Sequence, residues 1–242
     1  HILKPAIQEF EEIVSNEYFC LKIAKKIGLP VPDVEIRQTK DITFLLVKRY
    51  DRKTENNYVE RIHQEDFCQA LNIPPEQKYQ SEGGPSLKDC FTLLDRYIHQ
   101  GLMAGVNKLH LIDGVIFNFL IGNGDAHGKN CSVLYNGQGE EVAPFYDLLC
   151  TRIYLAPKDK MAMKMGGRYQ FQDIYRRHFH KLADEIGVKS TLIDKRIQAL
   201  APKVLDCAGG LVYKLNQDQH TGSPVYRKIC TVIKSQVEQL TL

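Results

Sequence analysis

The residues that decide the fold are Ile121-Gly-Asn-Gly-Asp-Ala-His-Gly-Lys-Asn130 and, after a hairpin-like segment, Pro144-Phe-Tyr-Asp147. Asn130 follows Asp125 by five positions, and Asp147 lies seventeen positions further along. A carboxylate, an amide and a second carboxylate in this order are the groups that phosphoryl transfer uses. The spacing therefore predicts Asp125 as the acceptor of the proton of an attacking hydroxyl, and Asn130 and Asp147 as magnesium ligands.

An apolar helix is predicted just before this loop. Between Ile112 and Leu120 the apolar residues recur at the i, i+3, i+4, i+7, i+8 spacing of one helix face, and Gly122-Asn-Gly124 must end that helix. Asp125 is therefore expected on a loop that follows a buried helix. The alternative is that Asp125 and Asn130 are turn residues, present for backbone geometry alone.

A hairpin favours the functional interpretation over the turn interpretation. Residues 131–135 and 141–145 flank Asn136-Gly-Gln-Gly139, which is a hairpin signal. Such a hairpin would return Asp147 to the loop that carries Asp125. The roles of two further side chains of the loop stay open. His127 could donate to a phosphate or to a carboxylate, or it could be structural. Lys129 could neutralise the transferred phosphate, or it could face solvent.

The first residues of the chain supply the other half of such a site. His-Ile-Leu-Lys-Pro places Lys4 at the end of a short predicted strand, and Glu17 falls near the start of the next predicted helix. A kinase holds a strand lysine on the nucleotide phosphates with a helix glutamate. Glu17 shares a helix face with Leu21 and Ala24, so it should point inward. The alternative is a surface glutamate that offsets the helix dipole, worth ~0.3–1 kcal/mol.

Composition narrows the class of protein. Of 242 residues, 43% are apolar and 25% are charged, which is ordinary for a globular chain. A net charge of +3 is too small to predict a nucleic-acid or membrane surface.

The seven scattered cysteines include no Cys-x-x-Cys pair, so we expect a cytoplasmic protein. No apolar run approaches the ~20 residues of a membrane span. Because the sequence opens on His1 without a leader, we expect no signal peptide and further residues upstream.

The order of elements predicts an α+β protein with two unequal parts. Ser15 is expected to cap a helix that runs to about Ile27 and ends at Gly28, and residues 34–38 and 42–48 should form an antiparallel hairpin whose second strand is buried on both faces.

A polar stretch near residues 50–58 then marks the expected hinge. We expect residues 1–54 to form a small, partial N-lobe that contains strands, and residues 55–242 a larger, mainly helical C-lobe. Within the C-lobe, residues 74–85 form a loop rich in proline and glycine, and the chain from residue 172 onward should be mostly helix.

With these residues assembled, the chain resembles the HipA-like serine/threonine kinases, the toxin components of bacterial toxin–antitoxin systems, over their C-terminal kinase portion. The resemblance rests on an ordered set of short motifs: His1-Ile-Leu-Lys4, Asn16-Glu17-Tyr18, Arg49-Tyr50-Asp51-Arg52, Gln64-Glu-Asp-Phe-Cys-Gln69, Lys78-Tyr79 with Gly83-Gly84-Pro85, Asp125-Ala-His-Gly-Lys-Asn130, Pro144-Phe-Tyr-Asp147 and Met161-Ala-Met163.

The resemblance implies a bilobal fold related to the lipid-kinase branch of protein kinases, with ATP and magnesium in the cleft. It implies that Lys4 contacts the phosphates, that Lys48 and Tyr50 offer hinge backbone groups to adenine, and that Gln64 lies near the nucleotide. It also implies that His127 and Tyr146 line the phosphate region.

The family also implies partners. Its target is typically an aminoacyl-tRNA synthetase, whose phosphorylation stops tRNA charging and growth, and its partner is a DNA-binding antitoxin, through which any contact with DNA is indirect. Short family members receive an N-terminal subdomain from a separate protein. The family's phosphate-covering loop, with its autophosphorylated serine, would lie upstream of Lys4 and is absent from this sequence.

Two other classes of function are compatible with parts of the pattern. A metal-dependent hydrolase could use Asp125, His127 and Asp147 as ligands, but it leaves Lys4 and Glu17 without a role. A non-catalytic binding module could keep the kinase fold for partner contact, and a small-molecule kinase is separated from a protein kinase only by the family resemblance.

Overall fold

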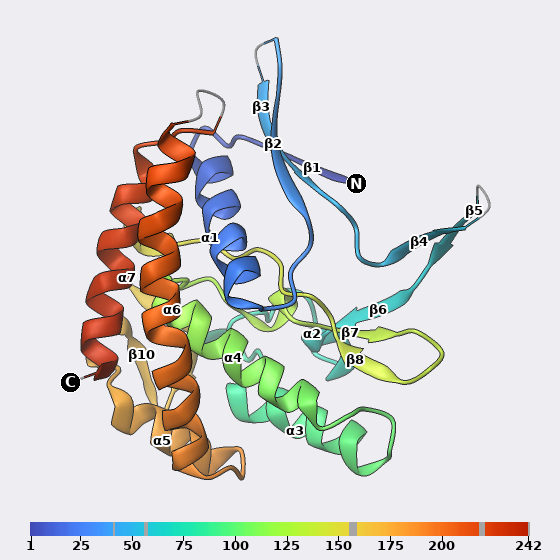
Figure 1. Cartoon of the computed structure of the whole chain (residues 1–242). Coiled ribbons are helices and arrows are strands. Elements are labelled where there is room, and N and C mark those ends of the chain that lie inside the picture. Colours follow the sequence, from blue (N-terminus) through green and yellow to red (C-terminus); the bar gives the residue numbers. More distant parts are fainter. Residues whose placement is uncertain (41, 56–57, 155–158, 218–220, 242) are drawn as a thin grey trace.

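A three-stranded antiparallel sheet and one helix form the N-terminal part of the computed structural model, which describes residues 1–40, 42–55, 58–154, 159–217 and 221–241. Strand β3 (Ile42–Val47) lies between β1 (Ile2–Pro5) and β2 (Val34–Thr39), and helix α1 (Ile13–Ile27) packs against β2 and β3 (Figure 1). These elements confirm the short N-terminal strand, the following helix and the hairpin that the sequence predicts.

Helix α1 ends where the sequence predicts, but it begins earlier. Gly28 adopts a left-handed conformation with φ of 92°, and its N–H donates to a carbonyl of the last turn. Ser15 was expected at the N-cap, yet the helix starts at Ile13, and the Ser15 hydroxyl donates to Glu12 Oε2 at 2.9 Å. The N-terminus therefore lacks the cap that the sequence suggested.

Burial of the central strand differs from the prediction. Leu45 is fully buried and Val47 is 7% exposed, whereas Ile42 is 55% exposed. The strand is apolar on both faces, but α1 covers only one face of the sheet, so the prediction that both faces are buried was wrong. On the neighbouring edge strand Leu3 is 60% exposed.

Strands also occupy the region where the sequence suggested a polar linker leading into helices. A hairpin of β4 (Arg52–Glu55) and β5 (Tyr58–Arg61) extends away from the rest of the molecule, and β6 (His63–Asp66) follows it (Figure 1). The expected boundary between residues 54 and 55 falls inside β4, and residues 56–57 lie outside the described residues, so the division into two lobes at this position stays a prediction.

A second three-stranded sheet carries the predicted hairpin. Strand β7 (Ser132–Tyr135) pairs with β8 (Glu140–Val142) on one side and with β6 on the other, all antiparallel. The sequence predicted the hairpin of β7 and β8 but not the third strand. Because β6 and β7 are separated by more than sixty residues, no local sequence pattern predicts that they pair.

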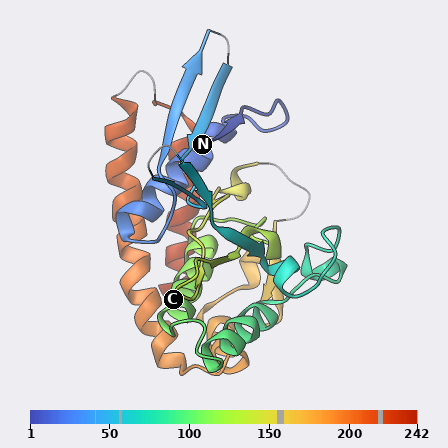
Figure 2. The same cartoon turned by 90° about the vertical axis from the view of Figure 1, so that its right-hand side faces the viewer.

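Helices make up most of the remaining chain, as the sequence predicts. The long helices α6 and α7 lie side by side and pack against α1 and α4 (Figures 1 and 2). The two-stranded sheet of β9 and β10, which contacts α3 and α5, was not predicted, because Lys, Met and Ala are not typical strand residues. The elements are α2 (Phe67–Ala70), α3 (Leu87–His99), α4 (Val106–Leu120), β9 (Lys160–Met165), β10 (Arg168–Gln170), α5 (Arg176–Glu185), α6 (Ser190–Asn216) and α7 (Val225–Thr241).

Helix α4 is the predicted apolar helix, and it is buried over most of its length. It ends at Leu120, and Gly122 with φ of 70° turns the chain into the loop of Asp125. A Cβ atom on Gly114 would lie 2.3 Å from Phe145 Cζ, and Phe145 is buried two residues before Asp147. The close approach at Gly114 thus brings the segment of Asp147 against the helix that leads to Asp125.

Among the described residues, none of the helices combines the length and apolar character that crossing a lipid bilayer requires.

This close approach predicts a destabilising Gly114→Ala substitution. The added methyl group should lower the free energy of unfolding by about 2 kcal/mol, because it overlaps a buried ring that cannot easily move. Gly209→Ala is the matched control: Gly209 is also inside a helix, but a methyl group there would meet no neighbouring side chain within 4 Å, so alanine should stabilise by about 0.5–1 kcal/mol. Chemical denaturation of both variants measures these changes, and equal effects at the two sites would contradict the steric argument.

Candidate active site

A network of hydrogen bonds shapes the loop that carries Asp125. The backbone N–H of Asp125 donates to Asn123 Oδ1 at 3.1 Å. Asn123 is buried, and its Nδ2 donates to Asn118 Oδ1 at 2.8 Å and to the backbone carbonyl of Asp147 at 3.3 Å. One buried amide therefore joins helix α4, the loop of Asp125 and the segment of Asp147.

The side chain of Asn130, a predicted magnesium ligand, is bonded to the backbone of the loop that carries Asp125. Its Nδ2 donates to the backbone carbonyl of Asp125 at 2.9 Å, which uses the nitrogen and orients the side chain. Asp147 adopts a left-handed conformation with φ of 52°, which is uncommon for a residue other than glycine, although aspartate and asparagine adopt it more often than most.

Lys4 bonds to two carboxylates from distant parts of the chain. Its Nζ lies 2.7 Å from Glu17 Oε1 and also donates to Asp147 Oδ1. Burial by itself would lower the pKa of Lys4, yet the two carboxylates raise that pKa above its ordinary value, so the ammonium stays charged. Burial raises the pKa of Glu17, which is 7% exposed, while Lys4 acts in the opposite direction.

A cavity of about 220 Å³ collects most of the residues that the sequence assigned to the nucleotide. Within it Gln64 Oε1 is buried and has no hydrogen-bond partner among the described residues. The rings of Tyr50 and Tyr146 lie 6.2 Å apart at 28°. The predicted residues that line the cavity are Lys4, Glu17, Lys48, Tyr50, Gln64, Tyr146 and Asp147.

These groups fit a nucleotide with magnesium. Gln64 Oε1 is a buried acceptor without a partner among the described residues, so it suits an N–H donor such as the amino group of adenine. The Lys4 ammonium suits phosphate oxygens, and the carboxylate oxygens of Asp147 are hard donors of the kind that magnesium takes. Asn130, the other predicted magnesium ligand, lies outside the lining of this cavity, so its role as a ligand stays a prediction. The N–H of Lys48 donates to the carbonyl of Asp33 at 2.8 Å, so only the Lys48 carbonyl can serve a hinge contact.

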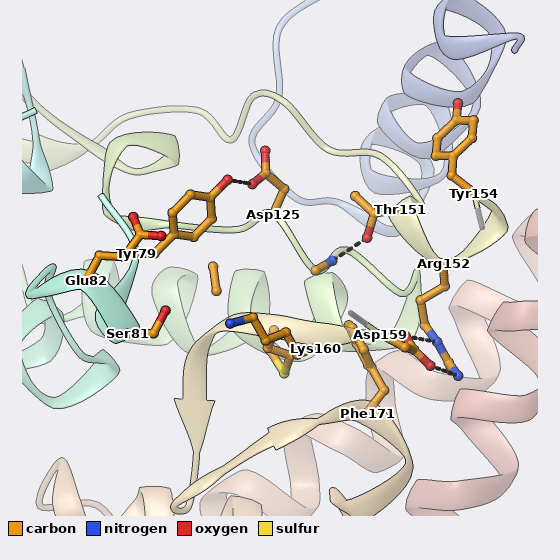
Figure 3. Close-up of a pocket in the computed structure, with 13 residues that line it drawn as sticks. Tyr79, Ser81, Glu82, Asp125, Thr151, Arg152, Tyr154, Asp159, Lys160 and Phe171 are labelled. Carbon is orange, nitrogen blue, oxygen red and sulfur yellow. Dashed lines mark hydrogen bonds and ion pairs between the residues drawn. The ribbon is translucent and has the colours of Figure 1, made fainter. Parts of the chain in front are cut away.

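A second cavity, of about 490 Å³, opens on the side of Asp125. Figure 3 shows Tyr79 pointing its hydroxyl at the Asp125 carboxylate, and Arg152 paired with Asp159 across from them. Thr151 Oγ1 accepts a hydrogen bond from the Gly124 N–H at 2.7 Å. Asp125 lines this cavity and Asp147 lines the smaller one, so the two carboxylates face different spaces.

His127 and Lys129, whose roles the sequence left open, lie outside the linings of both cavities. His127 is 5% exposed, burial lowers its pKa, and its Nδ1 has no partner among the described residues. Lys129 Nζ donates to Asp66 Oδ2 at 2.9 Å, and its backbone carbonyl accepts a hydrogen bond from the Tyr146 hydroxyl at 2.7 Å. A direct role for either side chain at phosphate stays a prediction.

Several residues that shape the site were missed at the sequence level. Asn123, Thr151 and Tyr79 all bond directly to the loop of Asp125. Asn16 joins α1 to the segment after Asp147, because its side chain exchanges hydrogen bonds with the backbone of Cys150 at 2.8 and 2.9 Å. Asn16 and Cys150 are 134 positions apart, so only the folded chain reveals this contact.

Two solved structures share the fold. The HipA chain in a complex of the Shewanella oneidensis toxin–antitoxin system, with HipB and operator DNA, matches at a TM-score of 0.85 with 24% identity, over 96% of this chain and 57% of that chain. The Helicobacter pylori proinflammatory kinase CtkA matches at a TM-score of 0.65 with 16% identity, over 98% of this chain and 84% of that chain. The protein therefore has a kinase-like α+β fold.

Sequence comparisons define the family. The family model of the HipA-like C-terminal domain matches residues 1–208, and the chain belongs to this family. It is 47% identical over 201 residues to the putative kinase Y4mE of Sinorhizobium fredii, covering 83% of this chain and 47% of that protein. It is 28% identical over 213 residues to the serine/threonine-protein kinase toxin HipA of Shewanella oneidensis, covering 84% of this chain and 49% of that protein. The chain thus spans about half the length of these relatives.

The ion pair at Lys4 predicts a stability change that needs no activity assay. Lys4→Met removes the cation between Glu17 and Asp147 and should lower the free energy of unfolding by about 2 kcal/mol, less than a fully buried pair because the Lys4 side chain is 33% exposed. Adding Glu17→Gln should recover about half of the loss, because no unpaired buried carboxylate then remains. Urea denaturation measures the free energy of unfolding of the single and the double variant. A double variant that is no more stable than Lys4→Met would show that an unpaired Glu17 carboxylate does not cause the loss.

Proposed function

We propose that this chain is the kinase portion of an ATP- and magnesium-dependent serine/threonine protein kinase. The observation that carries the proposal is the position of Lys4, bonded to both Glu17 and Asp147 at the cavity of about 220 Å³. Kinases need this lysine, held by a glutamate, beside a metal-binding aspartate. Asp125 then faces a separate cavity through which an acceptor hydroxyl can approach.

In this proposal each residue has one task. Lys4 binds phosphate oxygens of ATP, and Glu17 holds Lys4 in place. Asn130 and Asp147 hold magnesium, which when bound neutralises charge on the phosphates. Asp125 orients the acceptor hydroxyl and takes its proton, while the hydroxyl oxygen bonds to the γ-phosphorus and the bond from that phosphorus to the leaving ADP oxygen breaks.

The distance between Lys4 and Glu17 separates this proposal from a metal-dependent hydrolase. A hydrolase that used Asp125, His127 and Asp147 would need no contact between Lys4 and Glu17, and the two lie 2.7 Å apart. Among the described residues, no three or more His, Cys, Asp or Glu side chains are grouped to hold a metal ion. The contact between Lys4 and Glu17 favours phosphoryl transfer over this hydrolase.

We further propose that the whole protein is the toxin of a toxin–antitoxin system and acts in the cytoplasm. Family membership supports this role, as do a relative named as a kinase toxin and a structural neighbour in complex with HipB and operator DNA. The proposed substrate is an aminoacyl-tRNA synthetase, and the proposed partner is a DNA-binding antitoxin. Autophosphorylation would involve a loop upstream of Lys4, and an N-terminal subdomain could be fused or supplied by a separate protein.

Asp125→Asn tests the activity. In the full-length protein this change should lower phosphate transfer from labelled ATP to aminoacyl-tRNA synthetases in a bacterial extract by at least about 100-fold, because the amide cannot take the hydroxyl proton. Asp206→Asn makes the same chemical change on an exposed position of α6 and should leave transfer unchanged. Transfer by Asp125→Asn at the rate of the natural protein would refute the assignment.

A nucleotide titration separates the kinase from a non-catalytic module. ATP should bind the natural protein in a magnesium-dependent manner, and Asp147→Asn should weaken that dependence by removing a charged oxygen ligand. Isothermal titration with and without magnesium measures it. No magnesium-dependent affinity in the natural protein would favour the binding module.

A further inference from the structure

Tyr79 bonds directly to the carboxylate that the proposed reaction depends on. Its hydroxyl donates to Asp125 Oδ1 at 2.5 Å, and both residues line the cavity of about 490 Å³ (Figure 3). The bond occupies one carboxylate oxygen of Asp125. The other oxygen then has a defined direction, because rotation of the carboxylate would break the bond to Tyr79.

The loop that carries Tyr79 is built to hold it there. A Cβ atom on Gly84 would lie 2.4 Å from the carbonyl oxygen of Gln77, so only glycine allows this tight turn. The Gly84 N–H donates to the Tyr79 carbonyl at 2.9 Å, and the Gly128 N–H of the Asp125 loop donates to the Lys78 carbonyl at 3.4 Å. Backbone hydrogen bonds therefore fix the carbonyls of both Lys78 and Tyr79, and the bond to the Lys78 carbonyl comes from the loop of Asp125.

The aromatic ring of Tyr79 is fixed separately from its hydroxyl. It lies edge-on to the His127 ring, with centroids 5.2 Å apart at 85°, and Lys78 Nζ lies 5.1 Å from its centroid. Burial and the bond to Asp125 raise the pKa of Tyr79, so the hydroxyl keeps its proton and remains the donor at neutral pH. Removing only the hydroxyl should leave the ring and its contacts in place.

We propose that Tyr79 is a positioning residue for phosphoryl transfer: its hydroxyl holds Asp125 so that one carboxylate oxygen faces the acceptor hydroxyl in the cavity of about 490 Å³. Tyr79 acts through Asp125 and takes no proton from the acceptor. Its hydroxyl therefore affects the turnover step, and nucleotide binding in the other cavity does not depend on it. This inference rests on the proposed kinase activity.

Tyr79→Phe in the full-length protein tests the inference, because it removes the hydroxyl and keeps the ring. Two probes replace the unidentified substrate: dephosphorylated casein as a protein that carries hydroxyl groups, and water in basal hydrolysis of magnesium ATP. We expect kcat to fall about tenfold with either acceptor, because Asp125 is no longer preorganised. The KM for ATP should stay within about twofold, and the thermal unfolding midpoint should not change.

Tyr135→Phe is the matched control. The Tyr135 hydroxyl also donates to a carboxylate, Glu65 Oε2, at 2.8 Å, but it lies outside the linings of both cavities. Its kcat should equal that of the natural protein. A general effect of losing a tyrosine hydroxyl would lower kcat in both variants and would overturn the inference.

The remaining outcomes separate the inference from the activity on which it rests. If the natural protein turns over and Asp125→Asn does not, an unchanged kcat in Tyr79→Phe overturns the role of Tyr79 and leaves the kinase proposal intact. If Tyr79→Phe lowers kcat but also weakens the affinity for ATP and lowers the thermal unfolding midpoint, the role of Tyr79 is structural, and this outcome also overturns the inference. No turnover by the natural protein overturns both proposals.

Discussion

The ammonium group of Lys4, held between the carboxylates of Glu17 and Asp147, joins the parts of this protein that form the candidate site. Lys4 lies on β1, Glu17 on α1 and Asp147 after the hairpin of β7 and β8. Two carboxylates this close would repel each other and resist burial without a cation between them. In the proposed function the same charge would also bind phosphate oxygens, so the stability of the fold and the binding of nucleotide would depend on one side chain.

The candidate site comprises two cavities. One cavity contains Lys4 and Asp147, and the other contains Asp125, so the groups proposed for the nucleotide and for the acceptor face different spaces. Buried Asn123 sets their relation, because its amide bonds to α4 and to the backbone of Asp147 while its oxygen holds the backbone of Asp125. In the proposed reaction a phosphoryl group would pass from one of these spaces to the other.

Much of the fold could be predicted where the signal is local. The apolar face of α4, the glycine that ends α1 and the Asn-Gly-Gln-Gly turn between β7 and β8 each depend on residues close in sequence, and the structure confirms them. The predictions failed where distant residues decide. Strand β6 exists because β7 pairs with it, and one face of β3 stays partly exposed because α1 covers only the other. The start of α1 at Ile13, before the expected cap at Ser15, is a separate, local error of the prediction.

By itself, the sequence determined the chemical groups of the candidate site and their order, since Lys4, Glu17, Asp125, Asn130 and Asp147 follow from residue type, spacing and family motifs. Only the tertiary structure decided that Lys4, Glu17 and Asp147 meet at one cavity and that Asp125 lines another. It also brought in Tyr79, whose hydroxyl reaches Asp125 across 46 positions of sequence. The physical reason is that hydrogen bonds and ion pairs act over a few ångströms in space, whereas a sequence pattern records only neighbours along the chain.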